Sequence, residues 1–213
     1  MIFSHESPEY VRTAKRMGAN IHNGAYYYSK EILQHFIPNI ETDRNWVTVS
    51  IPGNCWDHSI FFVHNNVSQK IYDWLSDYED LVLVCGLPET QKRMSRLGLA
   101  VYLPLSIDVP YVEAFAREKD RDRAFFGRYA KAREQRFPIG TDVVCGLPRD
   151  ELLSEMARYR QAYAVGRTAI EAKVLGCELL PYDRRFPDPS IWKAVDSREA
   201  ASMLQGILDG IDG

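Results

Sequence analysis

The 213-residue chain lacks several features that assign a protein to a class directly. No apolar run approaches the roughly 20 residues that cross a bilayer, so we expect no membrane span. The four cysteines are widely spaced and form no CxxC pair, which favours buried free thiols over a zinc or redox site. No His, Asp and Glu residues have the tight spacing of metal ligands, and neither a Gly-x-Ser-x-Gly elbow nor a Walker-type loop is present.

An excess of positive charge is also absent, because the formal net charge is -3. Binding to nucleic acid therefore has no general electrostatic support. A local exception lies between Arg117 and Arg136, where eight basic residues stand against four acidic ones. This pattern is typical of a solvated, mixed-charge helical surface. The first eight residues lack the basic region and apolar stretch of a secretory signal, so we expect a cytoplasmic protein.

Short apolar runs alternate with segments of helical periodicity from Ser59 onward, a pattern that predicts a parallel sheet covered on both faces. The expected strands are residues 60–64, 81–85, 100–103, 124–127, 142–145, 162–165 and 178–181. The expected helices are residues 67–78, 90–97, 149–160 and 197–208. Earlier in the chain, residues 26–36 favour a helix and residues 46–51 a strand. The sequence thus predicts an α/β protein with mainly parallel sheets.

A five-residue echo suggests two related halves. Val-Cys-Gly-Leu-Pro occurs at residues 84–88 and again at 144–148, each time after an expected strand and before an expected helix. Open parallel sheets bind ligands at the carboxyl ends of their strands, so the position of the echo matters more than its letters. We place the boundary after residues 102–108, which predicts domains 1–108 and 109–213, two Rossmann-like units that face a cleft.

Residues 162–183 contain the most informative local pattern. They are expected to form a buried strand, a tight turn through Gly166, a short helix beginning near Thr168, a stop at Gly176 and a second strand. A helix entered from a strand through glycine offers backbone N–H groups and a positive dipole end, which together suit a phosphate. The pattern predicts a nucleotide-type ligand, although a plain βαβ crossover would have the same sequence features.

Four segments carry a resemblance to a known family. They are the expected strand 102–108, the stretch Phe-Phe-Gly-Arg-Tyr-Ala-Lys at 125–131, the Gly-Arg-Thr-Ala-Ile-Glu stretch that starts the helix at 166–176, and the helix at 197–208. In this order they resemble the two-domain nucleotide-sugar glycosyltransferases of the GT-B fold, particularly the retaining group often called family 4. The resemblance implies a nucleoside-diphosphate sugar as donor substrate and no separate cofactor, and the lack of metal-ligand spacing already predicts no dedicated metal site.

The resemblance also implies roles for individual residues. Arg128 would hold the donor diphosphate by a bidentate contact, and Lys131 or Arg133 would add positive charge against the leaving-group oxygens. Glu171 would accept hydrogen bonds from the ribose hydroxyls. The start of its helix would cradle phosphate through Gly166, Arg167 and Thr168.

The chain departs from the family at two points. Where the retaining family places a second glutamate, eight residues before the position of Glu171, this chain has Tyr163. The amino-terminal half is also shorter than the family's usual acceptor domain. Catalysis would then use other residues, or the site would only bind.

His64 and Asn65 are the candidate catalytic residues, because they follow an expected strand and so fall at the carboxyl edge of a sheet. A histidine in that place is also often a structural, hydrogen-bonded residue. Further candidates are His5, His22, Asp57 and His58.

The leading hypothesis is a compact glycosyltransferase-like enzyme that transfers a sugar to an unknown acceptor, whether a glycan, a protein or a modified nucleic acid. A second hypothesis is a catalytically silent module that binds a nucleotide or nucleotide sugar. The third is a glycosyltransferase acting on nucleic acid, with the basic residues of 117–136 on phosphate. An oligomer is compatible with all three.

Overall fold

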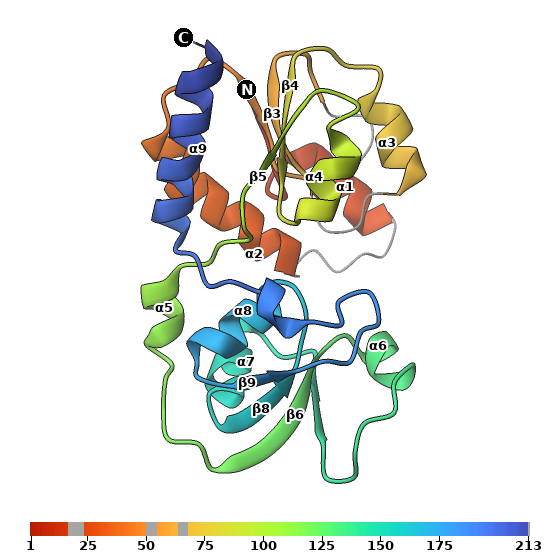
Figure 1. Cartoon of the computed structure of the whole chain (residues 1–213), viewed down its shortest axis with the longest axis vertical. Helices are drawn as coiled ribbons and strands as arrows, with labels where there is room; N and C mark the ends of the chain where they lie inside the picture. Colours follow the sequence, from red (N-terminus) through yellow and green to blue (C-terminus); the bar gives the residue numbers. More distant parts are fainter. Residues whose placement is uncertain (17–23, 50–54, 64–67, 213) are drawn as a thin grey trace. The chain divides into compact units, whose positions relative to one another are not determined.

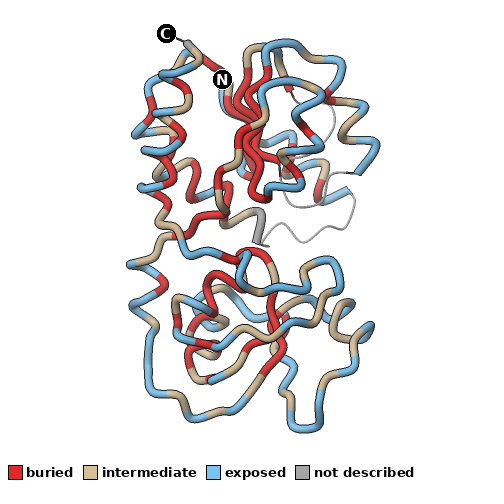
Figure 2. The backbone as a smooth tube through the Cα atoms, viewed as in Figure 1, coloured by how far each residue is buried: buried red, intermediate tan, exposed pale blue. Residues whose placement is uncertain are grey.

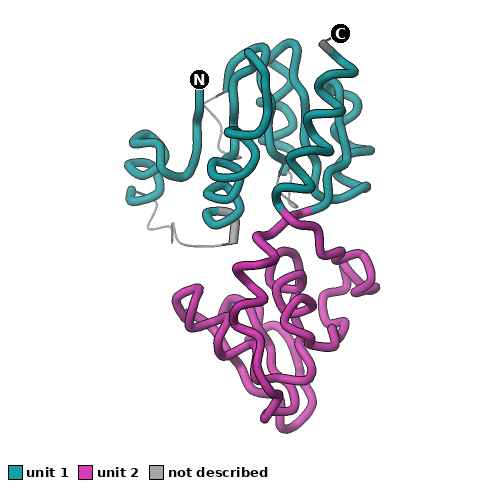
Figure 3. Tube along the Cα trace, turned by 90° about the vertical axis from the view of Figure 1, so that its left-hand side faces the viewer, with its two compact units in different colours: residues 1–104, 197–213 teal, residues 105–196 magenta. Residues whose placement is uncertain are grey.

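The structure is a computed structural model, which describes residues 1–16, 24–49, 55–63 and 68–212. The chain forms two compact units, which we call unit 1 and unit 2 (Figure 3). Unit 1 comprises Met1–Pro104 and Ser197–Gly213, and unit 2 comprises Leu105–Asp196. Each unit contains a parallel sheet with helices around it, which confirms the α/β class expected from the alternating pattern.

Unit 1 has a five-stranded sheet in which the strands lie in chain order, all parallel. The strands are β1 (Ile2–Phe3), β2 (Asn45–Val47), β3 (Ser59–Val63), β4 (Leu81–Cys85) and β5 (Leu99–Tyr102). The helical elements are α1 (Pro8–Arg16), α2 (Gly24–Glu31), a π-helix (Ile32–Phe36), a 3-10 turn (Ile37–Asn39), α3 (Gln69–Leu75), α4 (Pro88–Met94) and α9 (Ser197–Asp212). Every residue of β3 and β4 is buried, as continuous apolar strands require when both faces are covered (Figure 2).

Neighbouring aromatic residues of β3 reach the two layers of unit 1. Side chains alternate along a strand, so Phe61 and Phe62 point to opposite faces. Phe61 contacts Trp74 of α3, with ring centroids 5.7 Å apart. Phe62 meets Phe36 of the π-helix at 5.8 Å and Tyr28 of α2 at 6.0 Å. Figure 1 shows α9 on the same side as α2, away from α3 and α4. The sheet therefore has helices on both faces.

Helix α9 belongs to unit 1 although it follows unit 2 in the sequence. Its first residue, Ser197, donates a hydrogen bond to Glu31 of α2 at 3.2 Å, and Gln205 accepts the backbone N–H of Glu41 at 2.8 Å. The apolar face consists of buried Ala200, Ala201, Leu204 and Leu208. Because this apolar face is buried in unit 1, the chain is divided at two points, after Pro104 and before Ser197. The sequence predicted a single division into residues 1–108 and 109–213.

Unit 2 has a four-stranded parallel sheet in the order β7-β6-β8-β9. Its strands are β6 (Arg121–Gly127), β7 (Asp142–Cys145), β8 (Tyr159–Tyr163) and β9 (Glu178–Leu180). Its helices are α5 (Val109–Glu113), α6 (Tyr129–Arg133), α7 (Arg149–Met156), α8 (Arg167–Val174) and a 3-10 turn (Pro189–Ile191). Across the described parts of both units, no helix is both long enough and apolar enough to cross a membrane.

The strand order of unit 2 contains a reversal of direction. From β6 the chain passes through α6 to β7 on one side, then through α7 to β8 on the other side of β6, and onward through α8 to β9. Because such crossovers are right-handed, the reversal places α6 on one face of the sheet and α7 and α8 on the other. The topological switch point, where open α/β sheets bind ligands, therefore lies between β6 and β8 at their carboxyl ends.

Candidate functional site

The loops after β6 and β8 flank the switch point of unit 2. The two strands are paired, with Phe125 opposite Tyr163. The chain leaves β6 at Gly127 and β8 at Tyr163. The two family-like segments identified in the sequence, around Arg128 and around Gly166, therefore follow adjacent strands and share one edge of the sheet.

Gly166 makes the turn that starts α8. Its backbone has φ 65° and ψ −142°, the mirror image of an extended conformation, which residues with a Cβ atom avoid. Helix α8 begins at the next residue, Arg167, and Thr168 is half-buried in its first turn. The first turn of a helix presents backbone N–H groups and the positive end of the dipole. The sequence predicted this turn and the helix start, and the strand order of unit 2 places both beside the switch point.

Arg128 and Lys131 lie on the opposite side of the switch point, Arg128 directly before α6 and Lys131 in its last turn. Arg128 is the exposed N-cap residue of this helix, and Arg133 is exposed in its last turn. Lys131 lies 3.9 Å from Asp183, which Arg185 also contacts at 2.6 Å. Partial burial, followed by the nearby cation Arg185, lowers the pKa of Lys131. The neighbouring Arg128 lowers that pKa further, while Asp183 raises it.

Glu171 is buried beside two arginines, and we call the three residues Arg149, Arg167 and Glu171 the Arg–Glu–Arg cluster. Glu171 Oε1 accepts a hydrogen bond from Arg167 Nε at 3.0 Å and lies 3.2 Å from Arg149 Nη2. The Glu171 side chain is only 6% exposed. Its carboxylate is engaged by side chains of the same unit, which the family resemblance did not suggest.

Arg149 was not among the site residues predicted from the sequence. It is the first residue of α7, directly after the second copy of the Val-Cys-Gly-Leu-Pro echo. Its guanidinium carbon lies 5.2 Å from the ring centroid of Tyr111 in α5. The rule that strand ends share one edge of a parallel sheet pointed to this position, but the echo was read only as a sign of two related units.

Arginine follows all four strands of unit 2 at the carboxyl edge. The residues are Arg128 after β6, Arg149 after β7, Arg167 after β8, and Arg184 and Arg185 after β9. Carboxylates there are shared, since Glu171 contacts Arg149 and Arg167 and Asp183 contacts Lys131 and Arg185. Each of these two carboxylates thus contacts two cations.

The amino edge of the same sheet has the reverse arrangement. Arg121 lies 3.4 Å from Asp142 and 3.3 Å from Glu155. Arg158 lies 2.9 Å from Asp120 and 3.1 Å from the same Glu155. Here each arginine serves two carboxylates. The basic stretch 117–136 noted in the sequence is also divided by β6, because Arg121 and Arg128 stand at opposite ends of that strand.

Tyr163, which stands where the retaining family places a glutamate, lies in an aromatic cluster. Its ring centroid is 5.0 Å from that of Phe137, which in turn lies 5.0 Å from Phe125 of β6 and 6.0 Å from Tyr182. Burial, with a smaller effect of Asp183, raises the pKa of Tyr182 to about 12. In this cluster Phe137 and Tyr182 pack against Phe125 of β6 and Tyr163 of β8, and the described side chains of the cluster include no carboxylate.

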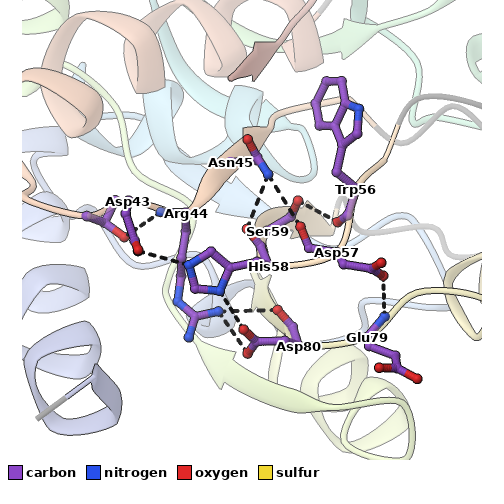
Figure 4. A network of polar contacts seen from close by, with 10 residues as sticks. Asp43, Arg44, Asn45, Trp56, Asp57, His58, Ser59, Glu79 and Asp80 are labelled. Atoms are coloured by element: carbon purple, nitrogen blue, oxygen red, sulfur yellow. Dashed lines mark hydrogen bonds and ion pairs between the residues drawn. The ribbon is translucent and has the colours of Figure 1, made fainter.

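The candidates His58 and Asp57 lie at the amino edge of the unit 1 sheet, directly before β3. Open parallel sheets bind ligands at the opposite, carboxyl edge. Figure 4 shows the His58 ring between two carboxylates, with Nδ1 2.5 Å from Asp80 and Nε2 2.9 Å from Asp43. These hydrogen bonds, the one to Asp80 first, raise the pKa of His58. Arg44 contacts Asp80 at 3.0 Å, and Asp57 accepts the backbone N–H of Glu79 at 2.7 Å. The network ties together the starts of β2, β3 and β4.

The remaining histidine candidates are only partly placed. His64 and Asn65, the candidate catalytic residues, and His22 lie outside the described residues. His5 follows β1 at the carboxyl edge of unit 1, where it is buried with its ring 4.6 Å from that of Tyr10. Among the residues that the structure describes, no three His, Cys, Asp or Glu side chains are grouped in a way that could hold a metal ion.

Comparisons with known proteins add no assignment. No protein-family model matches the chain, and searches of curated proteins and of solved structures gave no significant match. Function must therefore be argued from the site itself.

Proposed function

We propose that the protein is a glycosyltransferase-like enzyme whose unit 2 binds the diphosphate of a nucleoside-diphosphate sugar. The observation that carries the proposal is the position of Arg128 and Gly166 on the two loops that flank the switch point between β6 and β8. Open α/β sheets bind nucleotides at that place, and the start of α8 suits an anion.

The charge at this edge supports an anionic ligand. Arg128 and Lys131 stand on one side of the switch point, and Arg167 with the start of α8 on the other. Arginine binds phosphate oxygens through paired N–H groups, and lysine adds a compact positive charge. In glycosyl transfer from a nucleotide sugar, the same cations would stabilise the charge that develops on the departing diphosphate.

Calorimetric titration with UDP, GDP, ADP and CDP sugars tests the binding step. We expect at least one donor to bind, and Arg128→Gln to weaken it about tenfold or more, since a hydrogen bond to a charged group is worth about 1.5–3 kcal/mol. The matched control is Arg160→Gln, an exposed arginine of β8 that donates to the carbonyl of Lys119. Absence of binding by every donor, or equal affinity of Arg128→Gln and the wild type, would refute the proposal.

A second function, binding without transfer, is favoured by one observation. Tyr163 and its aromatic neighbours occupy the position where the retaining family has a carboxylate near the reacting sugar. Release of nucleoside diphosphate from the bound donor, followed with a panel of glycan, peptide and nucleic-acid acceptors, separates the two functions. Turnover above the rate of an Arg128→Gln variant would exclude a silent binding module.

A further inference from the structure

Tyr129 is an exposed aromatic residue next to the proposed diphosphate site. It directly follows Arg128 as the first residue of α6, and 59% of it is exposed to solvent. Its ring lies at the carboxyl edge of the sheet, because Cε2 is 3.4 Å from the place that a Cβ atom on Gly146 would take, and Gly146 follows the last residue of β7. A ligand that contacts Arg128 at this edge is therefore within reach of the ring.

Tyr129 differs from the other tyrosines of unit 2 in its surroundings. Unit 2 contains five tyrosines, and four of them lie against a phenylalanine ring of the same unit: Tyr111, Tyr159, Tyr163 and Tyr182. Within the part of the chain that the structure describes, the side chain of Tyr129 has no ring contact, hydrogen bond or ion pair. Neither aromatic packing nor a polar network in the described fold therefore accounts for this side chain.

Gly146 leaves room for the Tyr129 ring without covering it. It has φ 76°, a left-handed conformation that favours glycine, and its missing side chain lets the ring lie beside the end of β7. A tyrosine side chain has only two rotatable χ angles, so it loses little conformational freedom when a ligand covers it. The ring is thus placed at the strand end with most of its residue still open to solvent.

We propose that Tyr129 is the platform on which the base of the nucleotide stacks. This inference rests on the proposed function and adds a second subsite to it, in which Arg128 binds the diphosphate and Tyr129 the base. Every base has a π-face, and stacking on an aromatic ring requires no enclosed pocket. The ligand is accordingly a nucleotide, which binds more tightly than a diphosphate without a base, and the Tyr129 hydroxyl is not needed for its binding.

Substitutions measured by calorimetric titration test the stacking. The probes are inorganic pyrophosphate, which has no base, and whichever of UDP, GDP, ADP and CDP binds tightest. We expect Tyr129→Ala to weaken the nucleotide about fivefold or more and pyrophosphate less than about twofold, because only the base loses a stacking partner. Tyr129→Phe keeps the ring and should bind both ligands as the wild type does. The matched control is Ile139→Ala, which truncates another exposed apolar residue of unit 2 and should change neither affinity.

Ligand-observed NMR on the wild-type protein gives a readout that requires no variant. Protons of a base stacked on the ring should shift upfield, and saturation of the aromatic protons of the protein should transfer more strongly to the base than to the ribose. Transfer without preference for the base, with no upfield shift, would contradict stacking. Circular dichroism verifies that Tyr129→Ala is folded, and the wild-type spectra decide the matter if it is not.

The outcomes separate this inference from the proposed function. Unchanged nucleotide affinity in folded Tyr129→Ala, or an equal loss for nucleotide and pyrophosphate, overturns the stacking role, and a clear loss of both ligands in Arg128→Gln then leaves diphosphate binding intact. Absence of binding by every nucleotide and by pyrophosphate in the wild-type protein overturns both.

Discussion

Replacement of Gly166 by alanine tests the turn that starts α8. With φ 65° and ψ −142°, this residue lies in a region that is essentially restricted to glycine, and an L-residue there costs about 1–3 kcal/mol. Against this, alanine reduces the freedom of the unfolded chain, a gain of about 0.4–1 kcal/mol. The net effect of Gly166→Ala should be a loss of about 1–2 kcal/mol from the free energy of unfolding.

The matched control makes the same chemical change in the other unit. Gly206 is exposed in α9, and a Cβ atom built there meets nothing within 4 Å. A glycine inside a helix costs about 0.5–1 kcal/mol relative to alanine, so Gly206→Ala should stabilise by about that amount. One substitution therefore has opposite signs at the two positions, for reasons of backbone geometry alone.

Hydrogen exchange resolved along the chain is the suitable assay, because it reports each unit separately. Gly166→Ala should reduce the protection of amides in β6 and β8, while Gly206→Ala should increase it in β3 and β4, since α9 belongs to unit 1. Unchanged or greater protection of β8 in Gly166→Ala would refute the argument from φ and ψ. Stabilisation of β6 and β8 by Gly206→Ala would refute the assignment of α9.

Three further outcomes follow from the structure. A Cβ atom on Gly127 would lie 2.6 Å from Cζ of Phe125, so Gly127→Ala should lower the free energy of unfolding by about 1–3 kcal/mol in urea titrations. The loss should be smaller in a Phe125→Leu background, where the clashing ring is absent. Equal losses in both backgrounds would contradict the clash. The pKa of Lys131 is lowered from its ordinary value of 10.5, so the affinity for diphosphate should fall as the pH rises through this lowered pKa and the ammonium loses its charge. Arginine stays charged, so Lys131→Arg should remove this fall in binding titrations from pH 7 to 10. A fall that persists in Lys131→Arg would exclude Lys131 as its origin. The pKa of His58 is raised in the folded protein, so the contribution of this histidine to stability is present below about pH 6.5 and is lost as the pH rises through the folded pKa. His58→Asn should therefore lower the Tm more at pH 6 than at pH 9; asparagine is chosen because it tolerates the positive φ of this position. An equal loss of Tm at both pH values would argue against the network.

The sequence predicted the α/β fold well where strands are fully buried. β4 matches residues 81–85, because a continuous apolar run between helical segments has few other interpretations. β7 also matches residues 142–145, although Asp142 and Val143 are exposed. β8 begins three residues earlier than the expected 162, at Tyr159, since polar Arg160 and Gln161 interrupt the apolar pattern. β1, of two residues, was not predicted, because such a short strand leaves no periodicity.

Long-range organisation was less accessible to the sequence. The periodicity of α9 predicted its buried face but not which sheet that face covers, and the helix packs in unit 1 through contacts with Glu31 and Glu41. The same holds for the site, where Glu171 was identified from a local motif. The ion pair that engages it comes from Arg149, 22 positions earlier in the chain. A motif describes neighbours in sequence, whereas the protonation and hydrogen bonding of a carboxylate depend on neighbours in space.

The strongest argument for an anionic ligand is the difference between the two edges of one sheet. At the amino edge of unit 2, Arg121 and Arg158 each contact two carboxylates, so these two arginines face three acidic residues, Asp120, Asp142 and Glu155. At the carboxyl edge, Glu171 and Asp183 each contact two cations, and two of these cations, Arg149 and Arg167, stand at helix starts, where the helix dipole is positive. Arginine is the first residue of both α7 and α8, although acidic residues are favoured at helix starts; Asp150 and Glu151 follow it in α7, whereas the first turn of α8 has no acidic residue. If cations of this edge bind a diphosphate, adding pyrophosphate should raise the Tm of the wild-type protein, and Arg128→Gln should reduce that increase in Tm. The opposite result, a lower Tm without ligand and an undiminished increase with it, would show that Arg128 serves the fold.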